Sequence, residues 1–279
     1  MIMNGKEVSS KIKSDIKAEI ESFEDKLTLC VVQIGNDEAS NVYVRQKEKM
    51  SNELGISFIH AKYDDNMTEE ELEKEVNRLN NDKNITGIII QLPIPNKYDT
   101  NKLINLISSN KDVDGLTNDN KVKLYNNEDS IVPCTPLGIM EILNYYDIDV
   151  KGKNVVIIGR SLLVSKPLFN LLLNKDATVT MCHSKTIDLP SITRGADILI
   201  SATGKPHLVT EDMVKDGAVV VDVGISRVDG KLCGDVDFEN VSKKASYITP
   251  VPGGVGPMTV TMLMKNTVDA YKKTKKLVR

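Results

Sequence analysis

The sequence predicts an α/β protein with two lobes, because it contains two series of alternating strands and helices. The first series covers about residues 1–116, and the second covers about residues 137–252. In both, short β-branched runs alternate with helical stretches, a pattern typical of parallel strands covered by helices. A chain of 279 residues is also long enough for two domains. We expect two long helices, near Thr135 and Met258, to join the lobes.

The first lobe is predicted to begin with an amphipathic helix, because apolar residues recur every fourth position from Val8 to Ile20. The next apolar runs, rich in β-branched residues, are predicted strands. The charged stretches between them are predicted helices, and Thr68 is the expected N-cap of the second one. The strands are expected at residues 27–34, 56–63 and 85–92, and these two helices at 39–54 and 68–79.

A polar stretch, Asn118–Ser130, separates the two series. Thr135 and Pro136 then predict the start of a helix, with Thr135 as the N-cap and Pro136 at the first helical position. The second lobe is expected to contain a doubly wound parallel sheet, with strands at residues 154–158, 178–182, 197–201 and 218–223. The last predicted helix, residues 257–279, belongs with the first lobe.

The composition excludes several classes of protein. Apolar residues make up 41% and charged residues 27%, which excludes a collagen, a mostly disordered chain or a membrane-spanning one. The net charge of −3 and the aromatic content of 4% give no reason to expect nucleic acid or a membrane as a partner. The four cysteines and three histidines lack zinc-ligand spacing, so we expect no metal site. Scattered cysteines and the charges in the first 25 residues favour a cytoplasmic protein without a signal peptide.

A nucleotide site is expected where the first strand of the second lobe meets its helix. Gly159 lies in that turn, where free helix N–H groups favour phosphate, although it is the only glycine of the usual G-x-G-x-x-G pattern. Arg160 could bind phosphate, and the next strand ends at Ser184 and Lys185 instead of the acidic residue of NAD sites. This favours NADP over NAD. The alternative is a domain of the same fold that binds no cofactor.

Two later strand ends face the same predicted crevice. Thr203 and Gly204 follow one strand, and Gly224 and Ile225 follow another. Glycines at such positions let the backbone approach a ligand closely, so these residues are candidates for cofactor binding. Ordinary tight turns are the alternative interpretation.

Candidate catalytic residues occur in the first lobe. Tyr43 and Lys47 are four positions apart on a predicted helix, so they share one face. Partial burial would lower the pKa of Lys47 from about 10.4 and make it a usable base. A surface contact is the alternative for this pair.

Two further segments could bind a ligand. Gln91 ends an apolar strand, where it could hydrogen-bond a ligand or only close the strand. The segment Asp112–Gly115 is a carboxylate-rich turn, where an aspartate could bind a ring with two donors or only shape the turn. Gly253 and Gly254 indicate a close backbone approach or a hinge.

Together these segments resemble one enzyme family closely. The chain is similar to the bifunctional methylenetetrahydrofolate dehydrogenases/methenyltetrahydrofolate cyclohydrolases, and the matching motifs run in family order across nearly the whole sequence. The motifs are YVRQK (43–47), GIIIQLPIP (87–95), KDVDGL (111–116), PCTPLG (133–138), GRS (159–161), CHSKT (182–186) and TPVPGGVGPMT (249–259).

The resemblance implies two reactions at one site. NADP would take a hydride from 5,10-methylenetetrahydrofolate, and water would then open the methenyl cation to 10-formyltetrahydrofolate. It also implies a Rossmann-like cofactor lobe and a homodimer formed through that lobe.

The resemblance implies roles for individual residues. Lys47 would be the central catalytic residue, Tyr43 would pack beside the folate ring and help to place Lys47, Gln91 would orient Lys47, and Asp114 would hold the pterin. The other implied substrate residues are Leu92, Pro252, Gly253, Gly254 and Val255, and the implied cofactor residues are Gly159, Arg160, Ser161, Ser184 and Ile225.

One position departs from the family pattern. Ser165 stands where the family usually has the glycine of V-G-x-P, and its side chain could crowd the cofactor or add a hydrogen bond. This departure bears on the dehydrogenase reaction, so a cyclohydrolase alone is an alternative. So are a shikimate-dehydrogenase-like NADP oxidoreductase and a non-enzymatic nucleotide-sensing protein.

Overall fold

The structure is a computed structural model that describes residues 1–277. The chain forms two compact units, which we name after their sheets. The five-stranded unit comprises residues 1–11 and 135–259, and the three-stranded unit comprises residues 12–134 and the chain from residue 260 onward. The chain passes between the units inside α1 (Gly5–Ile20), at the start of α6 (Cys134–Tyr145) and inside α10 (Gly256–Leu277).

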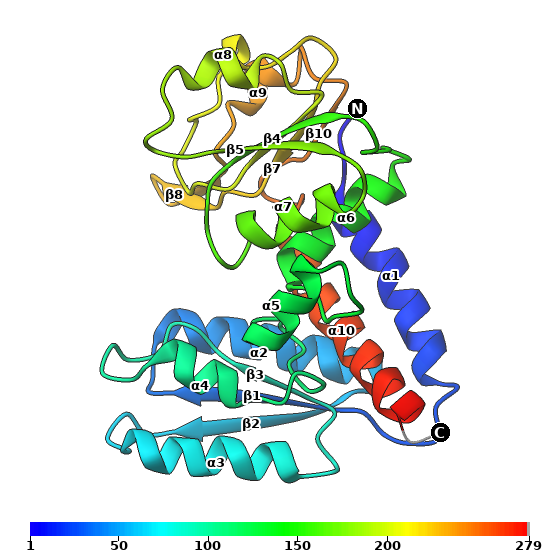
Figure 1. The fold of residues 1–279 in the computed structure, drawn as a ribbon, viewed down its shortest axis with the longest axis vertical. Coiled ribbons are helices and arrows are strands. Elements are labelled where there is room, and N and C mark those ends of the chain that lie inside the picture. Colours follow the sequence, from blue (N-terminus) through cyan, green and yellow to red (C-terminus); the bar gives the residue numbers. More distant parts are fainter. Residues whose placement is uncertain (278–279) are drawn as a thin grey trace. The chain divides into compact units, whose positions relative to one another are not determined.

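The three-stranded unit contains a parallel sheet in the order β2-β1-β3 (Figure 1). Its strands are β1 (Thr28–Ile34), β2 (Ser57–Tyr63) and β3 (Gly87–Ile90). Helix α3 (Glu69–Asn81) packs its apolar side chains against one face of this sheet, and Figure 1 shows α2 (Glu38–Leu54) on the other side. Two shorter helices follow, α4 (Thr100–Leu106) and α5 (Asn118–Tyr125).

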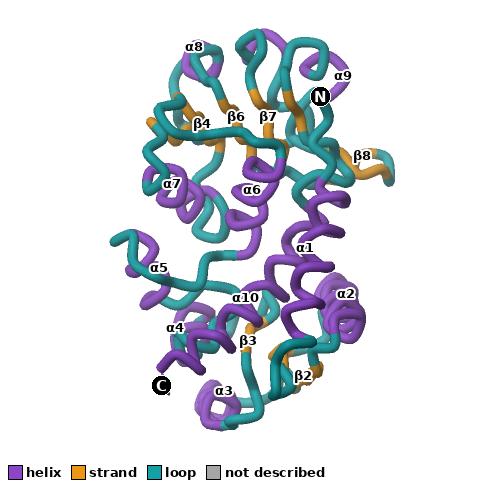
Figure 2. Tube along the Cα trace, turned by 90° about the vertical axis from the view of Figure 1, so that its right-hand side faces the viewer, coloured by secondary structure: helices purple, strands orange, loops and turns teal. Residues whose placement is uncertain are grey.

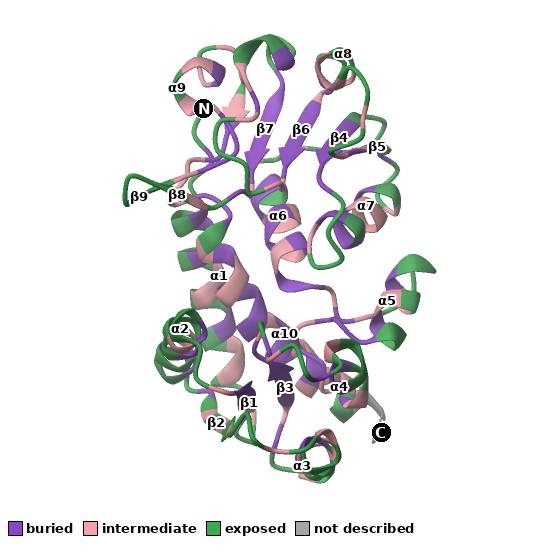
Figure 3. Cartoon of the chain, turned by 90° about the vertical axis from the view of Figure 1, so that its left-hand side faces the viewer, coloured by how far each residue is buried: buried purple, intermediate pink, exposed green. Residues whose placement is uncertain are grey.

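The five-stranded unit contains a parallel sheet in the order β10-β7-β6-β4-β5, whose middle strands lie side by side in Figure 2. These central strands are almost entirely buried, as Figure 3 shows, because helices cover the sheet. The strands are β4 (Asn154–Ile158), β5 (Thr178–Cys182), β6 (Ile198–Ser201), β7 (Val219–Asp222) and β10 (Tyr247–Ile248). The other elements are α7 (Ser165–Leu173), α8 (Leu189–Thr193), α9 (Phe238–Val241), the 3₁₀ turn η1 (Glu211–Met213) and the hairpin of β8 (Ser226–Val228) and β9 (Lys231–Cys233).

The first eleven residues differ from the expected division, which placed them in the first lobe. They group with the five-stranded unit because the backbone N–H of Met3 donates to the carbonyl of Ile248 at 2.8 Å, and Ile2 pairs with Ile248 beside β10. The N-terminal segment therefore extends the sheet at its β10 edge.

Of the two residues predicted to cap the start of a helix, Thr68 does so and Thr135 does not. Thr68 caps α3 as expected, since its Oγ1 accepts from the backbone N–H of Glu71 at 3.2 Å. The prediction for Thr135 was wrong, because α6 already begins at Cys134. The Thr135 hydroxyl instead lies 2.9 Å from that of Thr259. Pro136 lies within the first turn of α6, where a missing N–H breaks no hydrogen bond.

The polar stretch at residues 118–130 is not wholly irregular, because it contains α5. At the C-terminus, α10 is described to Leu277, and the last two residues of the predicted helix, 278 and 279, lie outside the described residues. No helix within residues 1–277 combines the length and the apolar character that crossing a membrane requires.

Candidate active site

The candidate cofactor residues gather at one edge of the five-stranded sheet. All its strands are parallel, so their carboxyl ends meet at that edge. Strand β4 pairs with β5 on one side and with β6 on the other, which places the reversal of strand order between β4 and β6. In doubly wound sheets, ligands bind at the carboxyl ends of the strands, next to the point where the strand order reverses. Gly159 follows β4, and Thr203 and Gly204 follow β6.

Gly159 is a glycine because its turn is crowded. Its φ is +137°, and a Cβ there would lie 2.6 Å from the carbonyl oxygen of Ala202 and 2.7 Å from Ser165 Oγ. The Gly159 N–H donates to the carbonyl of Cys182 at 2.8 Å, which fixes the turn against the end of β5. The turn at Gly159 thus lies directly before the start of α7.

The start of α7 is held by Ser161. Its Oγ accepts from the backbone N–H groups of Val164 at 3.1 Å and Ser165 at 3.2 Å. Because a hydroxyl also has a proton to donate, Ser161 can still bind a phosphate oxygen. The side chain of Arg160 is exposed beside it. Serine, guanidinium and helix N-terminus together fit a pyrophosphate.

The loop after β5 supports the preference for a 2′-phosphate. His183 orders this loop, since its backbone N–H donates to Thr186 Oγ1 at 2.8 Å and its Nδ1 accepts from the Lys185 N–H at 3.1 Å. The side chains of Ser184 and Lys185 are exposed, next to the Gly159 turn in the sheet register. A hydroxyl and a cation attract a 2′-phosphate, whereas the carboxylate of NAD sites would repel it.

The loops after β6 and β7 rest on a residue that the sequence did not single out. Asp235 accepts hydrogen bonds from Thr203, both from its backbone N–H at 2.6 Å and from its Oγ1 at 2.8 Å. Gly224 packs so tightly on Asp235 that any Cβ there would overlap with the carboxylate. Ile225, next in the chain, is 54% exposed and so is accessible to a ligand.

The glycine-rich segment, Pro252–Val255, follows β10 at the same edge of this unit. Gly253 has a φ of +107°, and the Gly254 N–H donates to the carbonyl of Pro250 at 2.8 Å. Gly5, at the start of α1, lies against the carbonyl of Gly254, where a Cβ would not fit. Sequence reasoning missed Gly5, which lies far from this segment along the chain.

Two of the candidate catalytic residues of the three-stranded unit, Lys47 and Gln91, are in direct contact. Lys47 Nζ donates to Gln91 Oε1 at 2.7 Å, and Gln91 Nε2 donates to the carbonyl of Leu92 at 2.6 Å. Lys47 comes from α2, and Gln91 directly follows β3. In the order β2-β1-β3 the strand order reverses between β1 and β3, so this contact lies at the ligand-binding position of such a sheet.

Burial and charge act in opposite directions on Lys47 and Asp114. Burial lowers the pKa of Lys47, and the negative charge of Asp114 partly opposes this effect. Burial likewise raises the pKa of Asp114, against the opposing charge of Lys47. The amine is therefore closer to its neutral form than an exposed lysine, which suits a proton acceptor.

The two aspartates of the DVDG turn have different roles. Asp112 is 1% exposed, and its carboxylate fixes the backbone that follows the turn. It accepts hydrogen bonds from the backbone N–H of Leu116 at 3.1 Å and of Thr117 at 2.8 Å. It also accepts from the Asn120 side chain at 2.9 Å. Asp114, in contrast, is the carboxylate that interacts with Lys47. Asp112 therefore has a structural role in the turn, and Asp114 remains the candidate ligand-binding residue.

Another missed residue is Asn266, which lies on α10. Its side-chain amide donates to the carbonyls of Val113 at 2.9 Å and Val132 at 2.8 Å, so it fixes the chain just before Asp114 and just before Cys134. Tyr43 is 51% exposed on α2, where its ring is accessible to a ligand. The structure thus places Tyr43, Lys47, Gln91 and Asp114 in the three-stranded unit. It places Pro252–Val255 and the candidate cofactor residues in the other unit.

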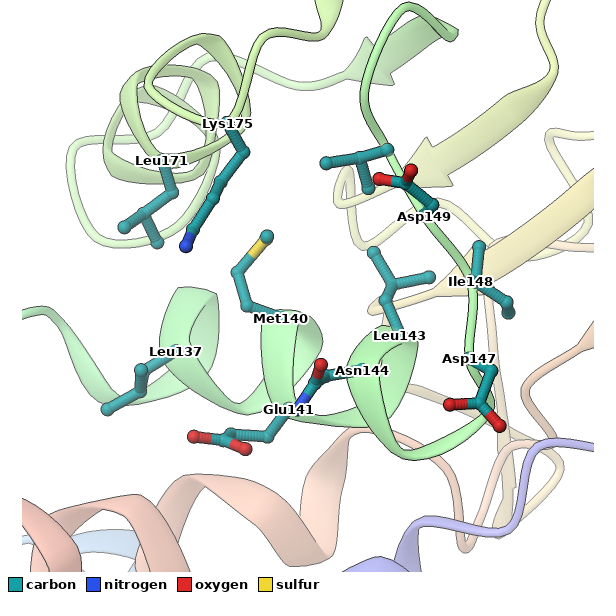
Figure 4. Close-up of a pocket in the computed structure, with 11 residues that line it drawn as sticks. Leu137, Met140, Glu141, Leu143, Asn144, Asp147, Ile148, Asp149, Leu171 and Lys175 are labelled. Carbon is teal, nitrogen blue, oxygen red and sulfur yellow. The ribbon is translucent and has the colours of Figure 1, made fainter.

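A separate cavity of about 620 Å³ lies in the five-stranded unit (Figure 4). The side chains of Met140, Leu171 and Lys175 point into it. Asp149 and Val150, which precede β4, also line it, so it lies toward the amino ends of the strands. None of the candidate site residues lines this cavity. Among the described residues, no group of three or more His, Cys, Asp or Glu side chains could hold a metal ion.

Comparisons with known proteins agree with this geometry. The catalytic-domain model of the tetrahydrofolate dehydrogenase/cyclohydrolase family matches residues 3–114, and its NAD(P)-binding-domain model matches residues 133–275. The bifunctional protein FolD of Campylobacter concisus is 53% identical over 273 residues, which cover 96% of each chain.

Solved structures are similar over nearly the full length. The FolD methylenetetrahydrofolate dehydrogenase/cyclohydrolase of Campylobacter jejuni has 46% identity and a TM-score of 0.96, covering 98% of this chain and 99% of that one. The Trypanosoma brucei methylenetetrahydrofolate dehydrogenase-cyclohydrolase, solved with NADP and an inhibitor, has 37% identity and a TM-score of 0.92, covering 99% and 98%. The chain therefore belongs to the tetrahydrofolate dehydrogenase/cyclohydrolase family.

Proposed function

We propose that this protein oxidises 5,10-methylenetetrahydrofolate to the 5,10-methenyl cation with NADP, and then hydrolyses the cation to 10-formyltetrahydrofolate. The observation that carries the proposal is the contact of Lys47 with Gln91, in which a partly buried amine with a lowered pKa is held by a hydrogen bond. Membership of the family and the NADP-bound relative from Trypanosoma brucei support the two reactions and the cofactor.

Lys47 acts in the hydrolytic reaction. As water attacks the carbon between N5 and N10, the neutral amine accepts the proton that the water loses. The carbon–oxygen bond then becomes the formyl C=O as the hydroxyl proton leaves to solvent, and the bond from that carbon to N5 breaks as N5 takes up the proton held by the Lys47 ammonium, so that the formyl group remains on N10. An ammonium group would repel the cationic substrate, so the lowered pKa of Lys47 serves this step. Gln91 keeps the amine in place through its 2.7 Å hydrogen bond.

Asp114 and Tyr43 bind the substrate in this proposal. The Asp114 carboxylate accepts from the amino edge of the pterin, and the exposed ring of Tyr43 packs against the folate ring. Leu92 and the segment Pro252–Val255 complete the folate-binding residues.

The chemistry that bound NADP would supply is a hydride acceptor for the methylene carbon. Arg160 and Ser161 bind its phosphates at the start of α7, and Ser184 binds the 2′-phosphate. The backbone of Gly159, Thr203, Gly204, Gly224 and Ile225 lines the remainder of the cofactor site. We further propose that the protein is a cytoplasmic homodimer that associates through its cofactor unit.

Two spectrophotometric assays test the proposal, one with methylenetetrahydrofolate and NADP and one with methenyltetrahydrofolate alone. Turnover in both supports a bifunctional enzyme, and turnover only in the second supports a cyclohydrolase alone. If neither assay shows turnover, the proposal is wrong, and a nucleotide-sensing protein or a shikimate-dehydrogenase-like enzyme gains support.

The substitution Lys47→Met tests the role of the amine. It removes the proton acceptor while keeping a side chain of similar length, so cyclohydrolase turnover should be abolished while folate binding survives. The exposed Lys49, two residues further along α2, supplies the control Lys49→Met, which should leave both activities unchanged. Full hydrolytic turnover in the Lys47 variant would contradict the mechanism.

A further inference from the structure

Two buried carboxylates lie under the loops that follow β6 and β7, and the proposed reactions use neither of them. Asp222 ends β7 and is 3% exposed, and Asp235 follows β9 and is fully buried. Ionised side chains are seldom buried without a compensating purpose, because removing a charge from water is costly. Their hydrogen bonds show what they hold.

Asp235 connects the end of β6 with the loop that follows it. Its Oδ2 accepts three hydrogen bonds, from Ser201 Oγ at 2.8 Å, from the Thr203 N–H at 2.6 Å and from Thr203 Oγ1 at 2.8 Å. Its Oδ1 is buried, accepts no hydrogen bond within the described part of the chain, and packs against Gly224. A single carboxylate thus touches both loops of the proposed cofactor site.

Asp222 holds the segment that carries Asp235. Its Oδ1 accepts from the N–H of Gly224 at 3.1 Å and of Asp235 at 3.0 Å, and its Oδ2 accepts from the N–H of Val236 at 2.9 Å. Gly234 packs on this carboxylate as closely as Gly224 packs on Asp235. The two acids and two glycines therefore form one interlocked unit, which fixes the turn at Gly224.

This arrangement restricts what Thr203 can contribute to the cofactor. Its hydroxyl proton is donated to Asp235, and its oxygen accepts from the Lys205 N–H at 3.2 Å. The loop therefore contributes to cofactor binding through its backbone conformation more than through the Thr203 hydroxyl. Asp235 determines that conformation.

We propose that Asp235 is a positioning residue for NADP, which sets the Thr203–Gly204 loop and the Gly224 turn in their binding conformation. The inference rests on the proposed function, because it assumes that these loops bind the cofactor. An amide at position 235 would put an N–H₂ group either against the Thr203 N–H, which cannot accept, or against Gly224, where the present Oδ1 has no hydrogen-bond partner among the described residues. The loops would then lose their fixed geometry, and binding would weaken.

The test compares Asp235→Asn with Asp237→Asn. Asp237 is two residues away, and its carboxylate accepts from Asn240 at 2.8 Å instead of holding either loop, so it is the matched control. We expect Asp235→Asn to raise the Kd and the KM for NADP by about tenfold, while kcat at saturating NADP changes less than about threefold. Cyclohydrolase turnover, measured without NADP, should match the parent, which shows that the fold is intact.

The outcomes are distinguishable. A parent protein that binds no NADP in titration calorimetry refutes the proposed function and this inference with it. A parent that binds NADP, together with a folded Asp235→Asn variant of unchanged affinity, refutes this inference alone. If Asp235→Asn fails to fold, Ser201→Ala decides, because it removes only one of the three donors to Asp235. It should then raise the Kd for NADP by about threefold, and an unchanged Kd would overturn the inference.

Discussion

The charge of Asp114 determines how far burial can lower the pKa of Lys47. Because this negative charge favours the ammonium form, Asp114→Asn should lower the pKa of Lys47 further. The neutral amine would then predominate at a lower pH, so the midpoint of the pH profile of cyclohydrolase kcat should move toward acid. The expected shift is about one pH unit, read from kcat at saturating folate so that weaker binding does not interfere. A midpoint at or above that of the parent would mean that Asp114 does not influence the amine.

Ser165 carries a buried hydroxyl that has no hydrogen-bond partner among the described residues. Leaving such a group without a partner costs about 1–3 kcal/mol, so Ser165→Ala should raise the free energy of unfolding by about 1 kcal/mol. Ser161→Ala should have the opposite effect and lower it by about 1 kcal/mol, because it removes the acceptor at the start of α7. Denaturant titration measures both. A loss of stability in Ser165→Ala would show that the hydroxyl has a stabilising contact.

The same position bears on the dehydrogenase reaction. Ser165→Gly restores the residue that the family usually has, and its NADP-dependent turnover can be compared with that of the parent. Since Ser165 Oγ would lie 2.7 Å from a Cβ at Gly159, it packs directly behind the phosphate turn. We expect turnover in the glycine variant to stay within about twofold of the parent, because the turn is already held by Gly159 and Ser161.

Single residues show where sequence reasoning succeeds. Lys47 and Gln91 were expected to interact, and the structure contains their hydrogen bond. The motif alone could not distinguish Asp112 from Asp114, since their difference arises only when the chain from Leu116 to Asn120 folds back and donates hydrogen bonds to Asp112. Asn266 and Gly5 were missed because nothing in their local sequence reveals the backbone segments that they contact.

At the scale of elements, strands were predicted better than short helices. The ranges of β4 and β5 agree with the expected ones. Strand β4 is a buried parallel strand and leaves a continuous apolar run in the sequence, whereas the more exposed β5 alternates threonine with apolar residues. Helices α4 and α5 were missed, since each is short and rich in asparagine and lysine. Caps define them: Asp99 Oδ1 accepts from the Lys102 N–H at 3.0 Å, and Thr117 caps α5. Such side-chain caps leave little periodicity for a pattern search.

Helix α5 should depend strongly on Asp112. Its carboxylate accepts three hydrogen bonds at the start of this helix, from two backbone N–H groups and the Asn120 amide. Asp112→Ala leaves these donors buried without a partner, so the free energy of unfolding should fall by about 3 kcal/mol or more. Asp114→Asn is the control, expected to change stability by less than about 1 kcal/mol. Equal losses in the two variants, measured by urea titration, would contradict the division of roles.

The whole molecule divides in a way that local patterns do not reveal. The helix from Gly5 to Ile20 is continuous, yet its first turns belong to one compact unit and the remainder to the other. Periodicity predicts the helix but not this boundary, which depends on contacts such as that of Met3 with Ile248. For that reason residues 1–11 of the expected first lobe group with the five-stranded unit.

The free energy of unfolding of the whole protein should depend on pH partly through the titration of Asp222. Burial raises the pKa of this carboxyl from 3.8 to about 6, against the opposing effect of its backbone hydrogen bonds. Between these two values the native state binds a proton that the unfolded state has released, so this group makes the protein more stable as the pH falls. A shift of about two units corresponds to about 3 kcal/mol. Asp222→Asn lacks this contribution, so the unfolding free energy of the parent minus that of the variant should grow by up to about 3 kcal/mol from pH 7 to pH 4. Urea titrations of both proteins across this range measure the difference, in which the other carboxyl groups largely cancel, and a constant difference would mean that Asp222 titrates normally.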